Sequence, residues 1–81
     1  MYNNDTVRTN IRNARIYRNY KQDYLAYMLN LSQNAYSKIE LGQTRISLET
    51  FLHIAKILEM DELELIGLER KNAVATLAIA V

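Results

Sequence analysis

Side chains that can donate and accept hydrogen bonds at once stand together at Gln33 and Asn34, and Lys38 follows one helical turn later. The preceding Ser32 offers an oxygen to the first amides of a helix, so we expect Gln33 and Asn34 at a helix N-terminus. Either amide can pair bidentately with adenine, and Lys38 can reach guanine or a phosphate. Ordinary solvated polar residues are the plainer explanation. We favour base recognition for Gln33 and Asn34 because of the elements that surround them, whereas for Lys38 the two explanations are about equal.

Other kinds of site chemistry find little support in the composition. The chain has 81 residues, no cysteine and one histidine, His53, so it has neither a disulfide nor a thiolate metal site. Acid–base or nucleophilic catalysis needs paired titratable groups in a pocket, which so short a chain does not supply. No apolar run approaches the ~18 residues that cross a bilayer. We expect one small cytoplasmic domain that is not an enzyme, with no metal or cofactor and no membrane partner.

Two short helices separated by a tight turn must position the amide pair. Leu25, Ala26 and Leu29 fall on one face of a helix that begins near Gln22. Asn30 can take the left-handed conformation that ends it, and Ser32 can cap the next helix. Such a pair of helices typically places its second helix in the major groove of DNA.

The same stretch resembles the Cro/C1-type (XRE-family) helix-turn-helix. The residues that match its pattern are Gln22, Ala26, Leu31, Ser37, Ile39, Glu40 and Gly42. Ser47–Phe51 and Ile54–Leu58 match its next helix, so the similarity extends from about Ile11 to Ile66. It implies an all-α, five-helix, lambda-repressor-like domain over residues 1–68. Tyr36 stands where the family prefers Val or Ile, which implies a core residue whose hydroxyl reaches the edge.

The resemblance also implies roles for individual residues. Gln33, Asn34 and Lys38 match the base-reading positions, and Gln22 matches a phosphate contact. Arg15 and Glu40 match a pair that links the first helix to the third, and Arg15 is also a candidate for phosphate contact. Polar or cationic neighbours of the recognition helix complete the predicted phosphate contacts: Lys21, Ser32, Ser37, Gln43, Thr44 and Arg45.

Three positions depart from the family pattern. Asn19 and Asn30 stand where glycine is usual, and asparagine is the least costly replacement at a left-handed position. Lys21 stands where Ser or Thr usually caps the second helix. Lysine cannot accept a hydrogen bond, so the missing cap costs ~1 kcal/mol. Phosphate contact and plain exposure explain Lys21 equally well.

Charge and apolar residues are distributed unevenly. Residues 1–45 hold seven of the ten basic residues and three of the nine acidic ones. That asymmetry suits a phosphate-facing N-terminal part, although a solvated surface is equally compatible with it. Residues 73–81 have no charged side chain, and their periodicity leaves helix and strand open. We expect residues 69–81 to serve dimerisation, with packing on the chain's own core as the alternative. The apolar residues predicted for the dimer interface are Leu52, Ile57, Leu65, Val74, Leu77, Ile79 and Val81.

These observations together predict a transcriptional regulator, of the repressor kind, that binds double-stranded DNA. We expect a homodimer on a pseudo-palindromic operator, because one recognition helix contacts too few base pairs for a specific affinity. The alternative is an antitoxin that binds a toxin through its acidic, apolar C-terminal part and autoregulates its operon.

Overall fold

The computed structural model describes residues 4–67, which fold into five helices with no strand among them. They are α1 (Asn4–Tyr17), α2 (Gln22–Met28), α3 (Gln33–Glu40), α4 (Leu48–Leu58) and α5 (Glu62–Leu65). The predicted all-α, five-helix architecture is confirmed. Residues 68–81 lie outside the described residues, and with them the predictions for a separate C-terminal tail and for Val74, Leu77, Ile79 and Val81.

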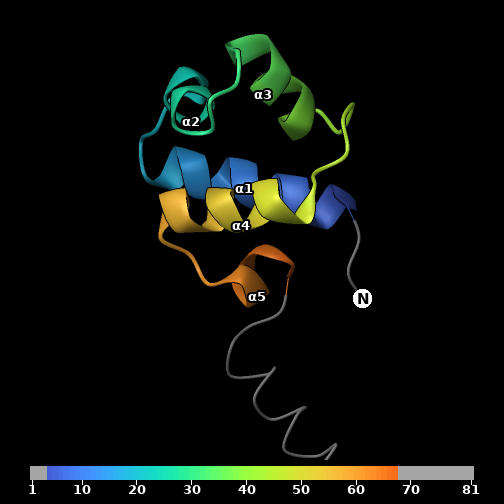
Figure 1. The fold of residues 1–81 in the computed structure, drawn as a ribbon. Coiled ribbons are helices and arrows are strands. Elements are labelled where there is room, and N and C mark those ends of the chain that lie inside the picture. The colour runs from blue at the N-terminus through green and yellow to red at the C-terminus, as the bar shows by residue number, and fades with distance from the viewer. Residues whose placement is uncertain (1–3, 68–81) are drawn as a thin grey trace, which may run out of the picture.

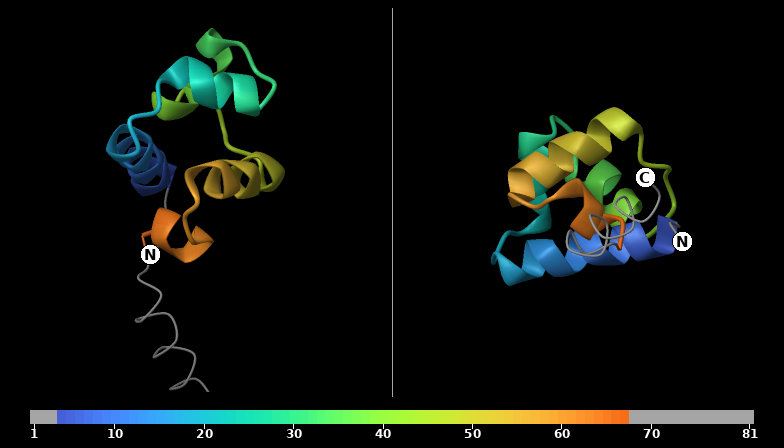
Figure 2. Two further views of the ribbon diagram at one scale, coloured as in Figure 1. Left: turned by 90° about the vertical axis from the view of Figure 1, so that its left-hand side faces the viewer. Right: turned by 90° about the horizontal axis from the view of Figure 1, so that it is seen from below.

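The helices form a platform with one unit above it and one below. α1 and α4 make the platform, α2 and α3 lie on one side of it, and α5 lies on the other (Figure 1). When the molecule is turned by 90° about the vertical axis, α1 and α4 are seen side by side with α5 beneath both (Figure 2, left). α1 contacts α3, α4 and α5, so it connects the upper unit to the lower one.

A single core joins all five helices. α1 contributes Val7, Ile11 and Ala14 at helical spacing, and these residues are at most 8% exposed. The core residues from the other helices are Leu25, Ala26, Tyr36, Ile39, Ile54, Ala55, Leu58 and Leu65. Because the upper helices are short, their burial against α1 and α4 supplies most of their stability.

Local backbone chemistry sets the limits of the helices. Ser32 caps α3 by accepting a hydrogen bond from the Ala35 amide at 3.0 Å, and Ser47 caps α4 through the Thr50 amide at 3.1 Å. Asn19 and Asn30 have φ angles of 61° and 59°, which confirms the left-handed positions that replace glycine. Lys21 is the N-cap of α2 and makes no side-chain capping bond.

α4 ends at a left-handed residue that is neither glycine nor asparagine. Its C-cap residue, Glu59, is left-handed at φ 54°, although its type gave no indication of this. Arg18, in the turn just after α1, donates to the Glu59 carboxylate at 3.2 Å and to its carbonyl at 3.4 Å. These contacts and the helix-closing backbone bond from the Met60 amide to the Ala55 carbonyl, at 2.9 Å, offset the strain.

Candidate DNA-binding interface

The predicted base-reading residues lie on the open side of α3. Gln33 and Asn34 begin the helix just after its Ser32 cap, and Lys38 lies one turn after Asn34. All three side chains are exposed, and none of them makes a hydrogen bond within residues 4–67. An exposed helix N-terminus with uncommitted amides can approach base edges without breaking any existing contact.

A shallow hollow of about 500 Å³ lies between α3 and the start of α4. Asn34 and Lys38 line it from α3, and Thr44 and Arg45 line it from the connecting loop. Its remaining polar lining residues are Ser32, Ser47 and Thr50. The structure therefore brings two predicted base readers and three predicted phosphate contacts, Ser32 among them, onto one surface. It also adds the hydroxyl residues Ser47 and Thr50, which sequence reasoning treated as part of a helix start only.

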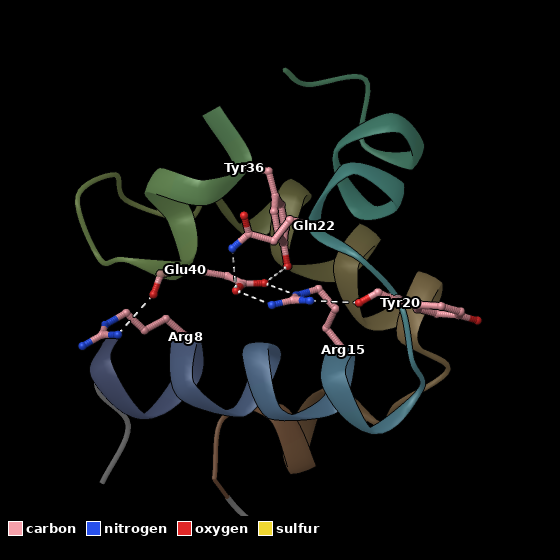
Figure 3. Close-up of polar contacts among 6 residues, drawn as sticks. All are labelled: Arg8, Arg15, Tyr20, Gln22, Tyr36 and Glu40. Carbon is pink, nitrogen blue, oxygen red and sulfur yellow. Dashed lines mark hydrogen bonds and ion pairs between the residues drawn. The ribbon is translucent and has the colours of Figure 1, made fainter. Parts of the chain in front are cut away.

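Several predicted phosphate residues lie outside this hollow. Lys21 and Gln43 are exposed, whereas Ser37 is half-buried. Gln22 is half-buried, and its amide nitrogen donates to Glu40 Oε1 at 3.1 Å (Figure 3). The amide retains a second N–H for a phosphate, and the Glu40 contact would fix its direction.

A buried ion pair holds α3 on α1. Arg15 Nε donates to Glu40 Oε2 at 2.6 Å, and Nη2 donates to Oε1 at 3.1 Å (Figure 3). The side chains of Arg15 and Glu40 are 11% and 3% exposed. The third nitrogen, Nη1, donates to the Tyr20 carbonyl at 2.9 Å, so the same guanidinium fixes the α1–α2 connection. A fork of this geometry is directional as well as strong.

Phosphate contact was the other role predicted for Arg15, and it stays a prediction. Each of its three guanidinium nitrogens points at a protein oxygen, and the side chain is nearly covered. Nη1 and Nη2 each retain a second N–H, but a side chain that is 11% exposed offers a phosphate little of the guanidinium group.

The Glu40 carboxylate collects donors from three helices. Besides Arg15 of α1 it accepts from Gln22 of α2, and from the Tyr36 hydroxyl of α3 at 2.5 Å. Four donated hydrogen bonds match the acceptor capacity of a carboxylate. Burial alone would raise the pKa of Glu40, but the bonds from Arg15, Tyr36 and Gln22 outweigh it, and the pKa lies below its ordinary value. The group is therefore charged at neutral pH.

Tyr36 has a second role that sequence reasoning missed. Its ring is fully buried and its hydroxyl donates inward to Glu40, so the predicted position of that hydroxyl at the edge is wrong. Burial, followed by the contact with Glu40, raises the pKa of Tyr36, which keeps the hydroxyl protonated as a donor. The pKa of Arg15 is raised as well, chiefly by its bond to Glu40.

Arg8 is a second arginine that holds α3, and no sequence pattern indicated it. Its Nη1 donates to the Glu40 carbonyl at 3.1 Å, thereby satisfying the C-terminal end of the helix. Arg8 Nε also donates to Asp5 Oδ1 at 3.2 Å. Gly42 lies against this side chain with φ 78°, and a Cβ atom there would lie 2.9 Å from Arg8 Nε. Glycine therefore avoids backbone strain here, and a larger residue would also have to displace the Arg8 side chain.

The predicted dimer residues of the helical part separate into three kinds. Leu52 is 44% exposed and can meet a partner. Ile57 is half-buried against the core. Leu65 has no exposed surface, so its prediction as an interface residue is wrong. The two helices α1 and α4 lie over α5 (Figure 2). The Leu65 side chain belongs to the buried core and does not face outward.

A helix-turn-helix family model matches residues 11–65, which include all of α2, α3 and α4. The chain belongs to the Cro/C1-type helix-turn-helix family. It is therefore a DNA-binding domain for double-stranded DNA, with α2 and α3 as its helix-turn-helix pair. No match was found among curated proteins or among solved structures.

No helix within residues 4–67 is both long and apolar enough to cross a membrane. In the same part of the chain, no group of three or more His, Cys, Asp or Glu side chains is placed to hold a metal ion.

Proposed function

We propose that this helix-turn-helix protein regulates transcription by binding a pseudo-palindromic operator as a homodimer. The observation that carries the proposal is the exposed N-terminus of α3, where Gln33 and Asn34 stand uncommitted beside a surface of cationic and hydroxyl donors. α3 is held from behind by Arg8 and Arg15, so its reading end is presented on a fixed support.

Base reading is assigned to Gln33, Asn34 and Lys38. An amide that pairs bidentately with adenine discriminates by ~1–3 kcal/mol per base pair, and a lysine in the major groove contacts guanine or a phosphate. Since these residues occupy the first turns of an eight-residue helix, they define a half-site of only a few base pairs.

Phosphate contacts are assigned to residues on both sides of the reading helix. Arg45, Thr44 and Ser32 line the hollow beside α3, and Ser47 and Thr50 join them from α4. Lys21 and Gln22 are at the start of α2, whose N-terminal amides favour an anion. Such contacts fix the register of the protein on the duplex and carry no sequence information.

A dimer follows from the size of the half-site. Specific binding in the usual nanomolar range requires more base contacts than one short helix can make. Two copies with their α3 helices about one turn of DNA, ~34 Å, apart would read a pseudo-palindrome.

The experiment begins with selection of bound sites from a random duplex pool by the full chain. Recovery of a two-fold symmetric consensus is the expected result. A pool that stays random would contradict the proposal. On the selected site, Gln33→Ala and Asn34→Ala should each cost ~1–3 kcal/mol and relax preference at one base pair per half-site. Asn13→Ala is the matched amide control, because Asn13 is exposed on α1 and lines a different hollow, beside α5.

Phosphate contact has its own signature. Arg45→Ala should weaken binding to all duplexes and reduce the slope of log K against log salt by about 1 per copy. Lys56→Ala removes another exposed cation, from α4 and away from the hollow, and should leave the slope unchanged. Equal slopes for the two variants would remove Arg45 from the interface.

A further inference from the structure

An apolar groove lies on the surface where α1, the start of α4 and the end of α5 meet. It encloses about 430 Å³, and every lining residue is apolar: Val7, Ile46, Leu48, Phe51 and Ile66. Leu48 is 71% exposed at its margin, and Leu52, one turn along α4, is 44% exposed. Apolar surface gathered in this way is typical of a site that a partner covers.

The chain leaves the described domain at the same place. Ile66 lines the groove, and a Cβ atom on the next residue, Gly67, would lie 3.1 Å from the Thr6 methyl carbon of α1. The sequence continues with a polar stretch, Glu69–Asn72, and then with residues 73–81, which carry no charged side chain. An uncharged apolar segment therefore begins within a few residues of an apolar groove.

We infer that residues 73–81 of a second copy of this chain fill the groove, so that two copies exchange these segments reciprocally. The inference rests on the proposed function, since it names the interface of the homodimer. A two-fold axis makes such an exchange self-complementary and closes it at two copies.

The area that a stable dimer needs favours this arrangement over contact between the helices alone. A specific interface buries about 800 Å² per partner and involves about 20–30 residues a side. On α4 the large apolar side chains that stand exposed are Leu48 and Leu52. Two side chains fall far short of that area, and the nine uncharged residues 73–81 are the further apolar surface that the sequence supplies.

The size of the groove argues against the chain's own segment as its sole cover. A volume of about 430 Å³ accepts a few aliphatic side chains but not all of a nine-residue apolar segment. A segment seated on its own domain would turn its other apolar side chains to water, which is unfavourable. Between two copies, both faces of the segment are covered.

The position of the groove suits DNA binding by the dimer. Leu48 lines the apolar groove, and its neighbour in the chain, Ser47, lines the hollow beside α3. A dimer axis near the start of α4 would set the two DNA-facing surfaces side by side, with both α3 helices uncovered. This is the arrangement that adjacent half-sites require.

The test uses the absence of cysteine from the chain. One sample carries Leu48→Cys, a second carries Leu77→Cys with a size tag, and the full-length chains are mixed and oxidised. Exchange predicts a disulfide between the two different chains, in excess of either like pair. A third sample carries both substitutions in one chain. A disulfide within that chain, with none between chains in the mixture, would overturn the inference in favour of the chain's own segment. Absence of a disulfide from both the mixture and the doubly substituted chain would overturn it as well.

A second measurement tests the groove without new covalent bonds. Leu48→Asn should weaken the dimer at least tenfold by sedimentation, and Leu41→Asn is its matched control, because Leu41 is 61% exposed at the end of α3 and outside the groove. Equal dimer affinity for the two variants would contradict the groove and favour another surface, such as the exposed tyrosines of α1 and α2. Operator binding is measured separately. A dimer that is cross-linked through the groove but selects no DNA site would refute the proposed function and leave the exchange standing.

Discussion

Replacing Arg15 by alanine should destabilise this domain more than any exposed substitution on α1. The change removes two hydrogen bonds from Glu40 and one from the Tyr20 carbonyl, and it leaves a carboxylate that is 3% exposed without its cation. Breaking a buried pair from one side costs ~3–5 kcal/mol. A domain of 81 residues has about 4–12 kcal/mol in total, so the variant should lose about a quarter of its stability or more.

The assay is thermal and urea unfolding followed by helical circular dichroism. A loss of ~3 kcal/mol corresponds to a decrease in Tm of at least ~12 °C for a domain of this size. Arg12→Ala is the matched control, because Arg12 is exposed on the same helix. If the free energies of unfolding of the two variants differ by less than about 1 kcal/mol, the ion pair does not hold α3 on α1, and that reasoning is refuted.

A companion variant separates the stranded charge from the lost packing. Combining Arg15→Met, Glu40→Met and Tyr36→Phe removes the cation, the carboxylate and the buried hydroxyl donor together. Buried ionic clusters replaced by apolar side chains often regain stability, so this triple variant should be more stable than Arg15→Ala. If it is not, the cost in Arg15→Ala arises from packing and not from an uncompensated Glu40.

Three further predictions concern the backbone, the pH and the helix cap. Gly42→Ala should cost ~1–2 kcal/mol from left-handed strain alone, and more because the new methyl group meets Arg8, as chemical denaturation would show. The pKa of Glu40 is lower in the folded chain, so its contribution to stability is complete above its ordinary value of 4.5 and is lost as the pH falls through the folded pKa. Acid melts of the wild type should therefore lose more stability below that value than those of Glu40→Gln, and parallel curves would contradict this. Lys21→Ser should stabilise the fold by ~1 kcal/mol by restoring a cap, and weaker DNA binding in the same variant would show that Lys21 contacts phosphate.

The parts of this fold that the sequence predicted are those governed by local chemistry. Ser32 and Ser47 cap helices because a hydroxyl two or three residues before a free amide can reach it whatever the rest of the chain does. Asn19 and Asn30 are left-handed because their side chains tolerate positive φ. Glu59 adopts the same conformation with no such preference, since its partner Arg18 lies 41 residues away.

The parts that sequence reasoning missed depend on distances across the fold. Arg8 reads as one of several helix arginines, and its contact with the Glu40 carbonyl spans 32 residues. The Tyr36 hydroxyl turns inward because Glu40 is there to accept its hydrogen bond. Leu65 is predicted for the dimer interface because it belongs to the apolar surplus of the C-terminal half, whereas the fold leaves it no exposed surface. No periodicity or motif in the sequence predicts any of these three contacts.

The division of α3 into an anchored end and an exposed end has a consequence for reprogramming this protein. The residues that keep the helix in place are Tyr36, Ile39 and Glu40, all buried, whereas Gln33, Asn34 and Lys38 are exposed. Exchange of the exposed three should hardly change folding, because exposed positions away from special contacts usually alter stability by less than ~0.5 kcal/mol. A combinatorial library at these three positions would then vary the target sequence on a constant scaffold, and altered recognition could arise by single substitutions without passing through unfolded intermediates.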